Sequence, residues 1–397
     1  MKYKIISFIF IIFIFIPYFK FLPFPSELQP NAFLIGLLLL IIMNKIYFSK
    51  LFYLLIIPMI FSILLLSMND FTIVHIKEVY GYTSFFLLSV ISYNYFIFYG
   101  EIKYKFYRNI LFIYMLVGLI QLYIQPNFFH IFLARELGYN GFQGRGVESM
   151  TTEPTYYGLI LLFIFILVYN SLVLSNNQKN RLYLLITISL LLVSKSTTAI
   201  VGFFIFLLFD FIKINIKLLI KFLFFLIASI FIFHYYYQDI ITLRVFKLFE
   251  FLLTGGIVEL INKDQSSNDR ILHVVFSIKG FFDSFGLPHG FSAWNDYIQL
   301  QSSLGYDTKY ISSEANKILS FIGTLLFELG VFSFPIFIYI FLVLKRRFKI
   351  RFLLTFSILF IYILFQALTI SYTFIPFILS FFLYQSKIIK KRINQNV

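Results

Sequence analysis

One short stretch between two long hydrophobic runs carries charged residues whose types could do chemistry. Residues 144–158 read GRGVESMTTEPTYYG and contain Arg145, Glu148 and Glu153. The planar guanidinium of arginine stays charged at neutral pH and binds phosphate oxygens through two parallel hydrogen bonds. A nearby acid could accept the proton of an attacking hydroxyl. The stretch therefore predicts a site for a phosphorylated substrate.

The same stretch also has a structural interpretation. Pro154 suits the first turn of a helix, where its missing N–H costs nothing, and Thr151 or Thr152 could cap that helix. Glu153 would then stabilise the positive end of the helix dipole. A solvated loop followed by a helix with an acidic start would explain these residues without catalysis, and both alternatives stay open.

A second stretch, residues 267–297, carries an arginine and a glycine-flanked histidine. We expect Asp269 or Asn268 to cap a helix that Arg270 opens. His289 lies in the sequence GLPHG, which is typical of a tight turn. A role in the turn is therefore the alternative to a catalytic role for this histidine.

A third stretch, residues 311–332, places two acids at different depths of a hydrophobic run. Glu314 lies where the run begins, at the expected membrane surface. Glu328 lies about three turns deeper, where an acid is costly and often functional. The alternative for Glu328 is a packing role, paired with a tyrosine or a lysine.

The composition indicates which elements position these residues. Of the 397 residues, 60% are hydrophobic and 13% are charged, whereas soluble domains are about half apolar and a quarter charged. Recurring hydrophobic runs predict an all-α, polytopic integral membrane protein with about 12 transmembrane helices. We expect spans near 4–20, 31–47, 51–68, 80–99, 109–125, 155–174, 181–194, 197–213, 218–236, 316–344, 351–367 and 369–386. The seventh and eighth could form a tight hairpin or a re-entrant pair. The first run lacks a small-residue cleavage site, so we expect a retained span and not a signal peptide.

The charges predict the orientation of these spans. With both termini in the cytoplasm, 21 of the 33 Lys and Arg residues and only 2 of the 18 acids fall on the cytoplasmic side. This satisfies the positive-inside rule, so the net charge of +15 indicates topology and not a nucleic-acid partner. We expect a single polytopic domain over residues 1–397. Its long polar segments, at about 126–154 and 237–315, face outward, and the second includes an interfacial helix at about 239–253.

Other chemistries find no support in the sequence. The chain has no cysteine, which excludes disulfides, thiol nucleophiles and thiolate metal sites. No HExxH, Walker or clustered-carboxylate motif occurs, so we expect no cofactor and no metal. Two outward arginines, Arg145 and Arg270, instead suit a lipid-linked diphosphate, because arginine can stabilise a departing diphosphate. The reaction would be glycosyl transfer between lipid-linked sugars.

The order of these motifs resembles that of the O-antigen/capsular polysaccharide polymerase family (Wzy-type), which is related to O-antigen ligases. GRGVESMTTEPTYYG precedes a middle span, SKSTTAIVGFF follows, NDR and SFGLPHGF lie in the large outer loop, and SEANKILSFIGTLLFELG closes the pattern. The resemblance covers about residues 130–345. It implies a glycosyltransferase of the bacterial inner membrane. Such an enzyme moves the growing glycan from one undecaprenyl diphosphate to the next lipid-linked repeat unit on the outer face.

The resemblance also implies roles for individual residues. Diphosphate binding would fall to three outward cations: Arg145, Arg270 and Lys195. Proton transfer would fall to one of four outward residues: Glu148, Glu153, Glu314 and His289. Ligases of this superfamily usually carry a histidine-asparagine pair where this chain has Ala315 and Asn316. This departure favours a polymerase and leaves the identity of the base open.

The resemblance implies that the partners are undecaprenyl-diphosphate-linked glycans and membrane lipid. A chain-length regulator protein could also bind, and we expect no nucleic-acid partner. The nearest alternative is an O-antigen ligase or O-oligosaccharyltransferase with another acceptor. A flippase for lipid-linked oligosaccharides is the alternative from a different class. Transporters tend to have repeated halves and charges near the midplane, whereas the charges here concentrate in outer loops.

Overall fold

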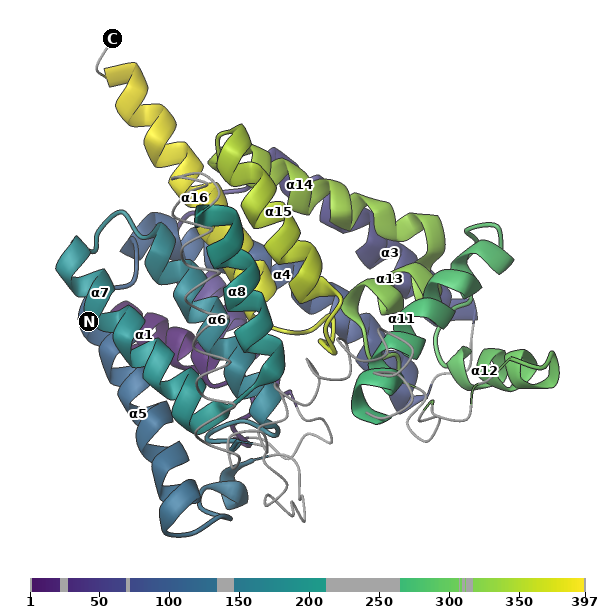
Figure 1. Cartoon of the computed structure of the whole chain (residues 1–397). Helices are drawn as coiled ribbons and strands as arrows, with labels where there is room; N and C mark the ends of the chain where they lie inside the picture. The colour runs from purple at the N-terminus through teal and green to yellow at the C-terminus, as the bar shows by residue number, and fades with distance from the viewer. Residues whose placement is uncertain are drawn as a thin grey trace. The chain divides into compact units, whose positions relative to one another are not determined.

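A computed structural model gives the fold of residues 2–21, 28–68, 72–133, 146–211, 265–306, 308, 311 and 317–395. This part of the chain is helical, and its only β-type pairing is an isolated bridge between Phe19 and Leu133 (Figure 1). The all-α prediction is therefore confirmed for these ranges. Four predictions lie outside the described residues: Arg145, Glu314, the span at 218–236 and the interfacial helix at 239–253.

The chain forms two compact units, and the division passes through helix α4 (Ile73–Tyr99) between Val90 and Ile91. Unit 1 holds the end of α4 together with α1 (Lys2–Phe15), α2 (Asn31–Ile42), α5 (Tyr104–Tyr123), η2 (His130–Phe132), α6 (Pro154–Asn170), α7 (Asn176–Ile188), the π-helical segment η3 (Ser189–Ser194), α8 (Thr197–Phe211) and α16 (Phe374–Gln395). Unit 2 holds the start of α4 together with η1 (Lys50–Phe52), α3 (Tyr53–Met68), α11 (Gln265–Asp283), α12 (Trp294–Ser303), α13 (Phe321–Leu329), η5 (Gly330–Ser333), α14 (Phe334–Arg347) and α15 (Ile350–Leu364).

Helices occupy each predicted span that falls in the described ranges, because runs of Leu, Ile and Phe favour helix when no polar residue interrupts them. Three helical segments are long and apolar enough to cross a membrane: Lys50–Ser67, Tyr104–Tyr123 and Phe321–Arg347. Other apolar helices among the described residues are 10–17 residues long. The chain is therefore built as a membrane protein, and the count of twelve spans stays a prediction.

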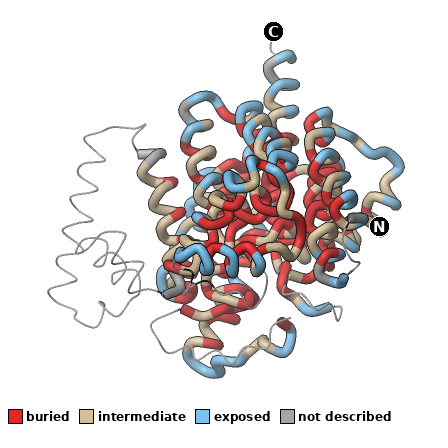
Figure 2. Tube along the Cα trace, turned by 90° about the vertical axis from the view of Figure 1, so that its right-hand side faces the viewer, coloured by how far each residue is buried: buried red, intermediate tan, exposed pale blue. Residues whose placement is uncertain are grey.

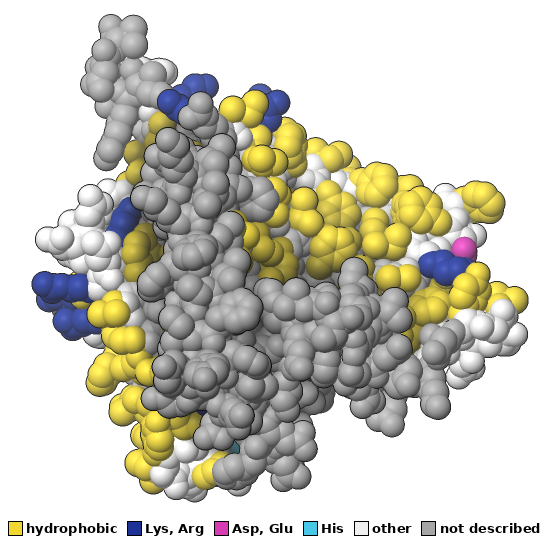
Figure 3. All heavy atoms as spheres, viewed as in Figure 1, with side chains coloured by type: hydrophobic (Ala, Val, Ile, Leu, Met, Phe, Trp, Pro, Cys, Tyr) yellow, Lys and Arg dark blue, Asp and Glu magenta, His cyan; other side chains and the backbone are white. Residues whose placement is uncertain are grey.

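Large hydrophobic side chains point outward from these three segments. The exposed fraction is 49% for Ile60, 53% for Phe112 and 50% for Phe341. On helices this apolar, such side chains face lipid and not water. Figure 3 shows hydrophobic side chains over α14 and α15 and basic side chains near the turn that joins them. Figure 2 shows buried residues along the helices and exposed residues mostly at turns and helix ends.

The helices are interrupted at two places within or between the predicted spans. The predicted span near 316–344 is helical from Phe321, and the 3-10 segment η5 separates α13 from α14 within it. The interruption lies at Gly330, which has φ +56° and packs so closely on Gly286 that a Cβ would overlap the Gly286 carbonyl. The break between the seventh and eighth spans is confirmed: η3 ends at Lys195 in the left-handed region, with φ +46°, and α8 begins at Thr197.

Candidate functional site

In unit 1, one glutamine of α5 holds the segment 146–153. The Gln121 amide donates to the carbonyl oxygens of Ser149 (2.9 Å) and Phe128 (2.8 Å), and its Oε1 accepts from the Ser149 N–H (2.6 Å). Ser149 Oγ donates to the Tyr114 carbonyl at 2.6 Å. Most of the segment is buried, and buried backbone groups must be paired. The segment is therefore fixed in place, and the alternative of a solvated loop is wrong for these residues.

The same segment lies against the turn that carries Lys195. The Val147 N–H donates to the Val193 carbonyl at 3.0 Å. Gly146 packs on the backbone of Ser194 so closely that a Cβ would overlap its carbonyl. The structure thus brings two predicted pieces of the site together, namely the motif around Glu148 and the turn at Lys195. Lys195 is half-buried, and its backbone N–H closes the π-helical turn on the Leu190 carbonyl.

Glu148 is buried and has a partner that the sequence did not indicate. Its Oε2 lies 3.0 Å from Nε2 of His130, which is half-buried in η2. Burial lowers the pKa of His130 below its usual value, so the imidazole is neutral near pH 7 and donates its Nε2–H to the carboxylate. The two residues meet only because 146–153 folds back onto the end of α5, and no local spacing predicts that contact.

Glu153 is placed as predicted, but the helix cap differs. It is the N-cap residue of α6, and Pro154 occupies the first helical position. The prediction that Thr151 or Thr152 caps the helix is wrong. The Thr151 hydroxyl instead donates to the carbonyl oxygens of Glu148 (2.7 Å) and Glu153 (2.8 Å), which closes the turn before the helix.

In unit 2, Arg270 lies in the second turn of α11. The helix begins at Gln265, so the prediction that Arg270 opens it behind a cap at Asp269 or Asn268 is wrong. Asp269 lies inside the helix, and its Oδ1 is 3.2 Å from Nε2 of His273, one turn on. Arg270 is half-buried and interacts electrostatically with Tyr362 of α15.

Helix α11 packs side by side with α13, and the two run in the same direction. Their close pairs advance together along both helices: His273 Nδ1 accepts from the Leu319 N–H at 3.3 Å, Ser277 lies against Gly323, and Gly280 lies against Phe327. Arg270 is one turn before His273, so it lies at the height of the residues that precede α13. These residues lead into the apolar segment Phe321–Arg347, so Arg270 lies near the start of that segment.

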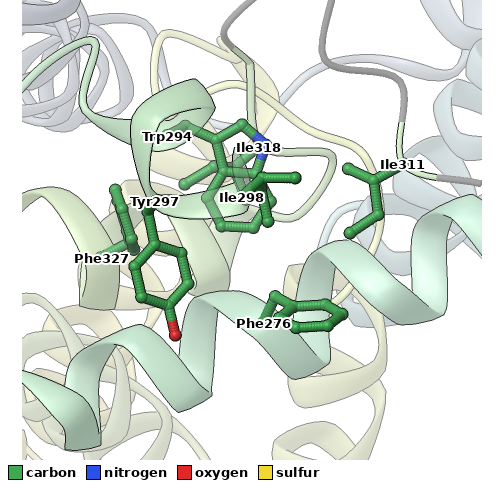
Figure 4. Close-up of a cluster of buried hydrophobic side chains, with 7 residues drawn as sticks. All are labelled: Phe276, Trp294, Tyr297, Ile298, Ile311, Ile318 and Phe327. Atoms are coloured by element: carbon green, nitrogen blue, oxygen red, sulfur yellow. The ribbon is translucent and has the colours of Figure 1, made fainter. Parts of the chain in front are cut away.

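His289 has a structural position. Its ring stacks on Phe327 with centroids 4.3 Å apart, and its Nε2 lies 2.9 Å from the Gly280 carbonyl. The backbone turn around it is confirmed, with φ +78° at Gly286 and φ +82° at Gly290. The ring belongs to the packing between α11 and α13. The buried cluster beside it joins α11, α12 and α13 (Figure 4) and consists of Phe276, Trp294, Tyr297, Ile298, Ile311, Ile318 and Phe327.

Glu328 pairs with a tyrosine, as the packing alternative predicted. Tyr82 of α4 donates its hydroxyl to Glu328 Oε2 at 2.8 Å, and both side chains are buried. From Lys345, at the basic end of α14, the helix rises place Glu328 at most about 28 Å away. A hydrocarbon core is about 30 Å thick. Glu328 therefore lies within the apolar segment Phe321–Arg347, in the half that is farther from the basic end of α14.

Sequence reasoning missed a second acid close to this pair, Glu78. It lies one turn before Tyr82 on α4, ahead of the predicted span at 80–99, and it is half-buried. Its carboxylate interacts electrostatically with Lys317, and also with Lys77 and His75. No local pattern indicated this residue, because Lys317 and Glu328 are more than 200 positions away in the chain.

The described residues therefore hold two groups of candidates, one in each unit: Glu148, Glu153 and Lys195 in unit 1, and Arg270, Glu78 and Lys317 in unit 2. The described ranges contain no group of three or more His, Asp or Glu side chains placed to hold a metal ion. A scan with protein-family models finds no matching family, and a search of curated proteins finds no match. The resemblance in motif order remains a prediction from the residues.

Proposed function

We propose that the chain is a membrane glycosyltransferase that polymerises undecaprenyl-diphosphate-linked repeat units on the outer face of a bacterial inner membrane. The observation that carries the proposal is the position of Arg270. This arginine is half-buried on α11, level with the start of an apolar segment whose other end carries Lys345, Arg346 and Arg347. The positive-inside rule assigns that basic end to the cytoplasm, which leaves Arg270 at the outer surface.

A lipid-linked diphosphate suits this position. Its polyprenyl chain would stay among the lipid-facing side chains, and its diphosphate would lie at the membrane surface beside the guanidinium. Arginine binds phosphate oxygens in a bidentate manner and balances the charge that develops as a diphosphate leaves. Lys317, two residues before Leu319, adds a second cation at the same end of α13. These features support glycosyl transfer in which the protein supplies the charge stabilisation.

The finer parts of the proposal come from the sequence. They are the twelve spans, the cytoplasmic termini, and diphosphate contacts from Arg145 and Lys195. The proposed substrates are lipid-linked glycans, and a chain-length regulator is the proposed protein partner. Glu148 and Glu153 remain base candidates of unit 1, with Glu148 held by His130.

The proposal is tested on the surface polysaccharide of a strain lacking the gene and complemented with the wild type, Arg270→Ala, Arg145→Ala or Lys279→Ala. Lys279 is the matched control, because it is a cation on the same helix that pairs with Asp283 at 2.7 Å. A polymerase predicts single repeat units for the two arginine variants and a normal ladder for the control, at equal membrane abundance. Removing one preorganised donor costs about 10²–10³ in rate.

Two outcomes would overturn the proposal. Complete loss of surface glycan in the deletion strain would indicate a flippase. Full-length polymer accumulating on its lipid carrier would indicate a ligase.

A further inference from the structure

We propose that Glu78 is the general base that deprotonates the acceptor hydroxyl, an assignment that rests on the proposed glycosyl transfer. Four observations lead to it: its half-buried position next to a buried polar pair, the lack of a described hydrogen-bond donor to it, the surrounding charges, and the position of Lys317 between Glu78 and the turn of α11 that carries Arg270.

Glu78 lies one helical turn from a buried polar pair. Glu78 and Tyr82 are four residues apart on α4 and therefore share one face of the helix. Tyr82 donates to Glu328, and both side chains are buried. His75, one turn before Glu78, is also buried and packs near the ring of Phe291. The half-buried Glu78 carboxylate therefore lies between two buried residues, His75 and Tyr82, on α4.

The Glu78 carboxylate is half-buried, and no described group donates a hydrogen bond to it. By contrast, Asp283 accepts from Lys279 at 2.7 Å and from Tyr297 at 2.8 Å, and Glu148 Oε2 lies 3.0 Å from His130 Nε2. A carboxylate whose lone pairs are already used by internal donors is a poor proton acceptor, whereas Glu78 keeps its oxygens for a substrate hydroxyl.

The charges around Glu78 come from several elements. Lys77 and His75 lie on α4, Lys317 comes from the residues before α13, and Glu328 faces the same cluster from α13 beside Tyr82. Lys317, Lys77 and His75 favour the charged form of the Glu78 carboxylate. Burial raises the pKa of Glu78 above that of an ordinary glutamate. A raised pKa brings a carboxylate closer to the operating pH, which improves a general base.

Lys317 connects Glu78 to the arginine. Two residues after Lys317, the Leu319 N–H donates to His273, which is one turn from Arg270 on α11. The residues that precede α13 therefore join a carboxylate on one side to a guanidinium on the other. A diphosphate at Arg270 would present its sugar carbon between them.

The proposed glycosyl transfer needs no reactant other than the lipid-linked donor and the acceptor. The acceptor oxygen forms a bond to the anomeric carbon while the bond from that carbon to the diphosphate oxygen breaks. The diphosphate leaves with the electron pair and is stabilised by Arg270. The hydroxyl proton passes to the Glu78 carboxylate and then to solvent.

The test uses the full chain in proteoliposomes with a lipid-linked donor and acceptor, and compares wild type, Glu78→Gln and Asp296→Asn. Asp296 is an exposed acid of the same unit, on α12, so its variant removes the same charge. We expect Glu78→Gln to slow transfer about 100-fold or more, to bind undecaprenyl diphosphate as the wild type does, and to lose the decline in rate at acid pH. Azide needs no deprotonation, so it should restore turnover of the variant and yield a glycosyl azide.

The outcomes separate the two proposals. If the wild type does not turn over, the proposed function fails and the base assignment fails with it. If the wild type is active and Glu78→Gln stays within a few-fold of it, only the base assignment is overturned. The assignment is also overturned if the variant loses undecaprenyl diphosphate binding, if azide restores nothing, or if Asp296→Asn is equally slow.

Discussion

The buried carboxylate of Glu101 offers the sharpest test of the packing in unit 1. Glu101 lies between α4 and α5 and is 9% exposed. Its Oε2 accepts from Ser171 Oγ at 2.8 Å and from the Leu172 N–H at 2.9 Å, and its Oε1 accepts from the Gln385 amide at 2.9 Å. The Gln385 amide also donates to the Asn170 carbonyl at 2.7 Å. One carboxylate therefore ties the end of α6 to α16.

Replacing Glu101 by alanine removes the acceptor from all three donors. Ser171 and Gln385 are buried, at 3% and 0% exposed, whereas Leu172 is 42% exposed and can bond to water. Each buried N–H or O–H bond that loses its acceptor costs about 1–3 kcal/mol. The variant no longer has to desolvate a carboxylate, which offsets part of this loss. The expected net loss is about 2–4 kcal/mol.

For a chain of 397 residues, such a loss corresponds to a fall in Tm of about 2–5 °C. Thermal unfolding of the purified protein in detergent would measure it. Glu101→Gln keeps one acceptor oxygen and should fall between alanine and wild type, while the exposed control Asp296→Ala should change Tm by no more than about 1 °C. If Glu101→Ala unfolds at the wild-type temperature, the three hydrogen bonds do not hold these helices together.

Two further predictions concern the outer segments. Gly146→Ala should destabilise unit 1 and expose residues 146–153 to protease, because the new Cβ overlaps the Ser194 carbonyl. Gly81→Ala is the control and should be tolerated, because its Cβ meets only ordinary contacts at 3.6 Å. Equal protease resistance of both variants would contradict the contact between Gly146 and Ser194. The hydrogen bond from Lys279 holds the pKa of Asp283 below its usual value. That carboxylate therefore contributes stability above about pH 4 that is lost as the pH falls through its folded pKa. Asp283→Asn should flatten the decline in Tm on acidification below pH 4, and an unchanged decline would refute the pairing.

The sequence predicted the positions of helices far better than the details of their ends. Long apolar runs specify helix because nothing else satisfies their backbone groups in a membrane, and the described spans follow them. Helix starts depend on single side-chain contacts. The Thr151 hydroxyl bonds to two carbonyl groups and not to a helix N–H, and Asp269 lies inside α11, one turn before His273, and does not cap it. The same residue type can cap a helix or make a different contact, so the sequence alone does not decide which of the two occurs.

The candidate site was predictable only in part, for a related reason. The charge distribution predicted that Glu148 and Lys195 lie on the same side of the membrane, and the structure brings their segments together through the contact of Gly146 with Ser194. Glu78 could not be found in this way. Its surroundings depend on the contact between Tyr82 and Glu328, which are 246 residues apart, and no local periodicity encodes such a pairing.

The two acids at the ends of α4 differ in their hydrogen-bond partners. Glu101, just beyond the C-terminal end of the helix, accepts from three donors, so its carboxylate holds helices together. Glu78, near the N-terminal end, interacts electrostatically with Lys317 but receives no hydrogen bond within the described residues. Leaving a half-buried carboxylate without donors costs stability, and only 13% of the residues in this chain are charged. The proposed role of Glu78 as a general base accounts for this cost, because the missing donor would then be the hydroxyl of a substrate.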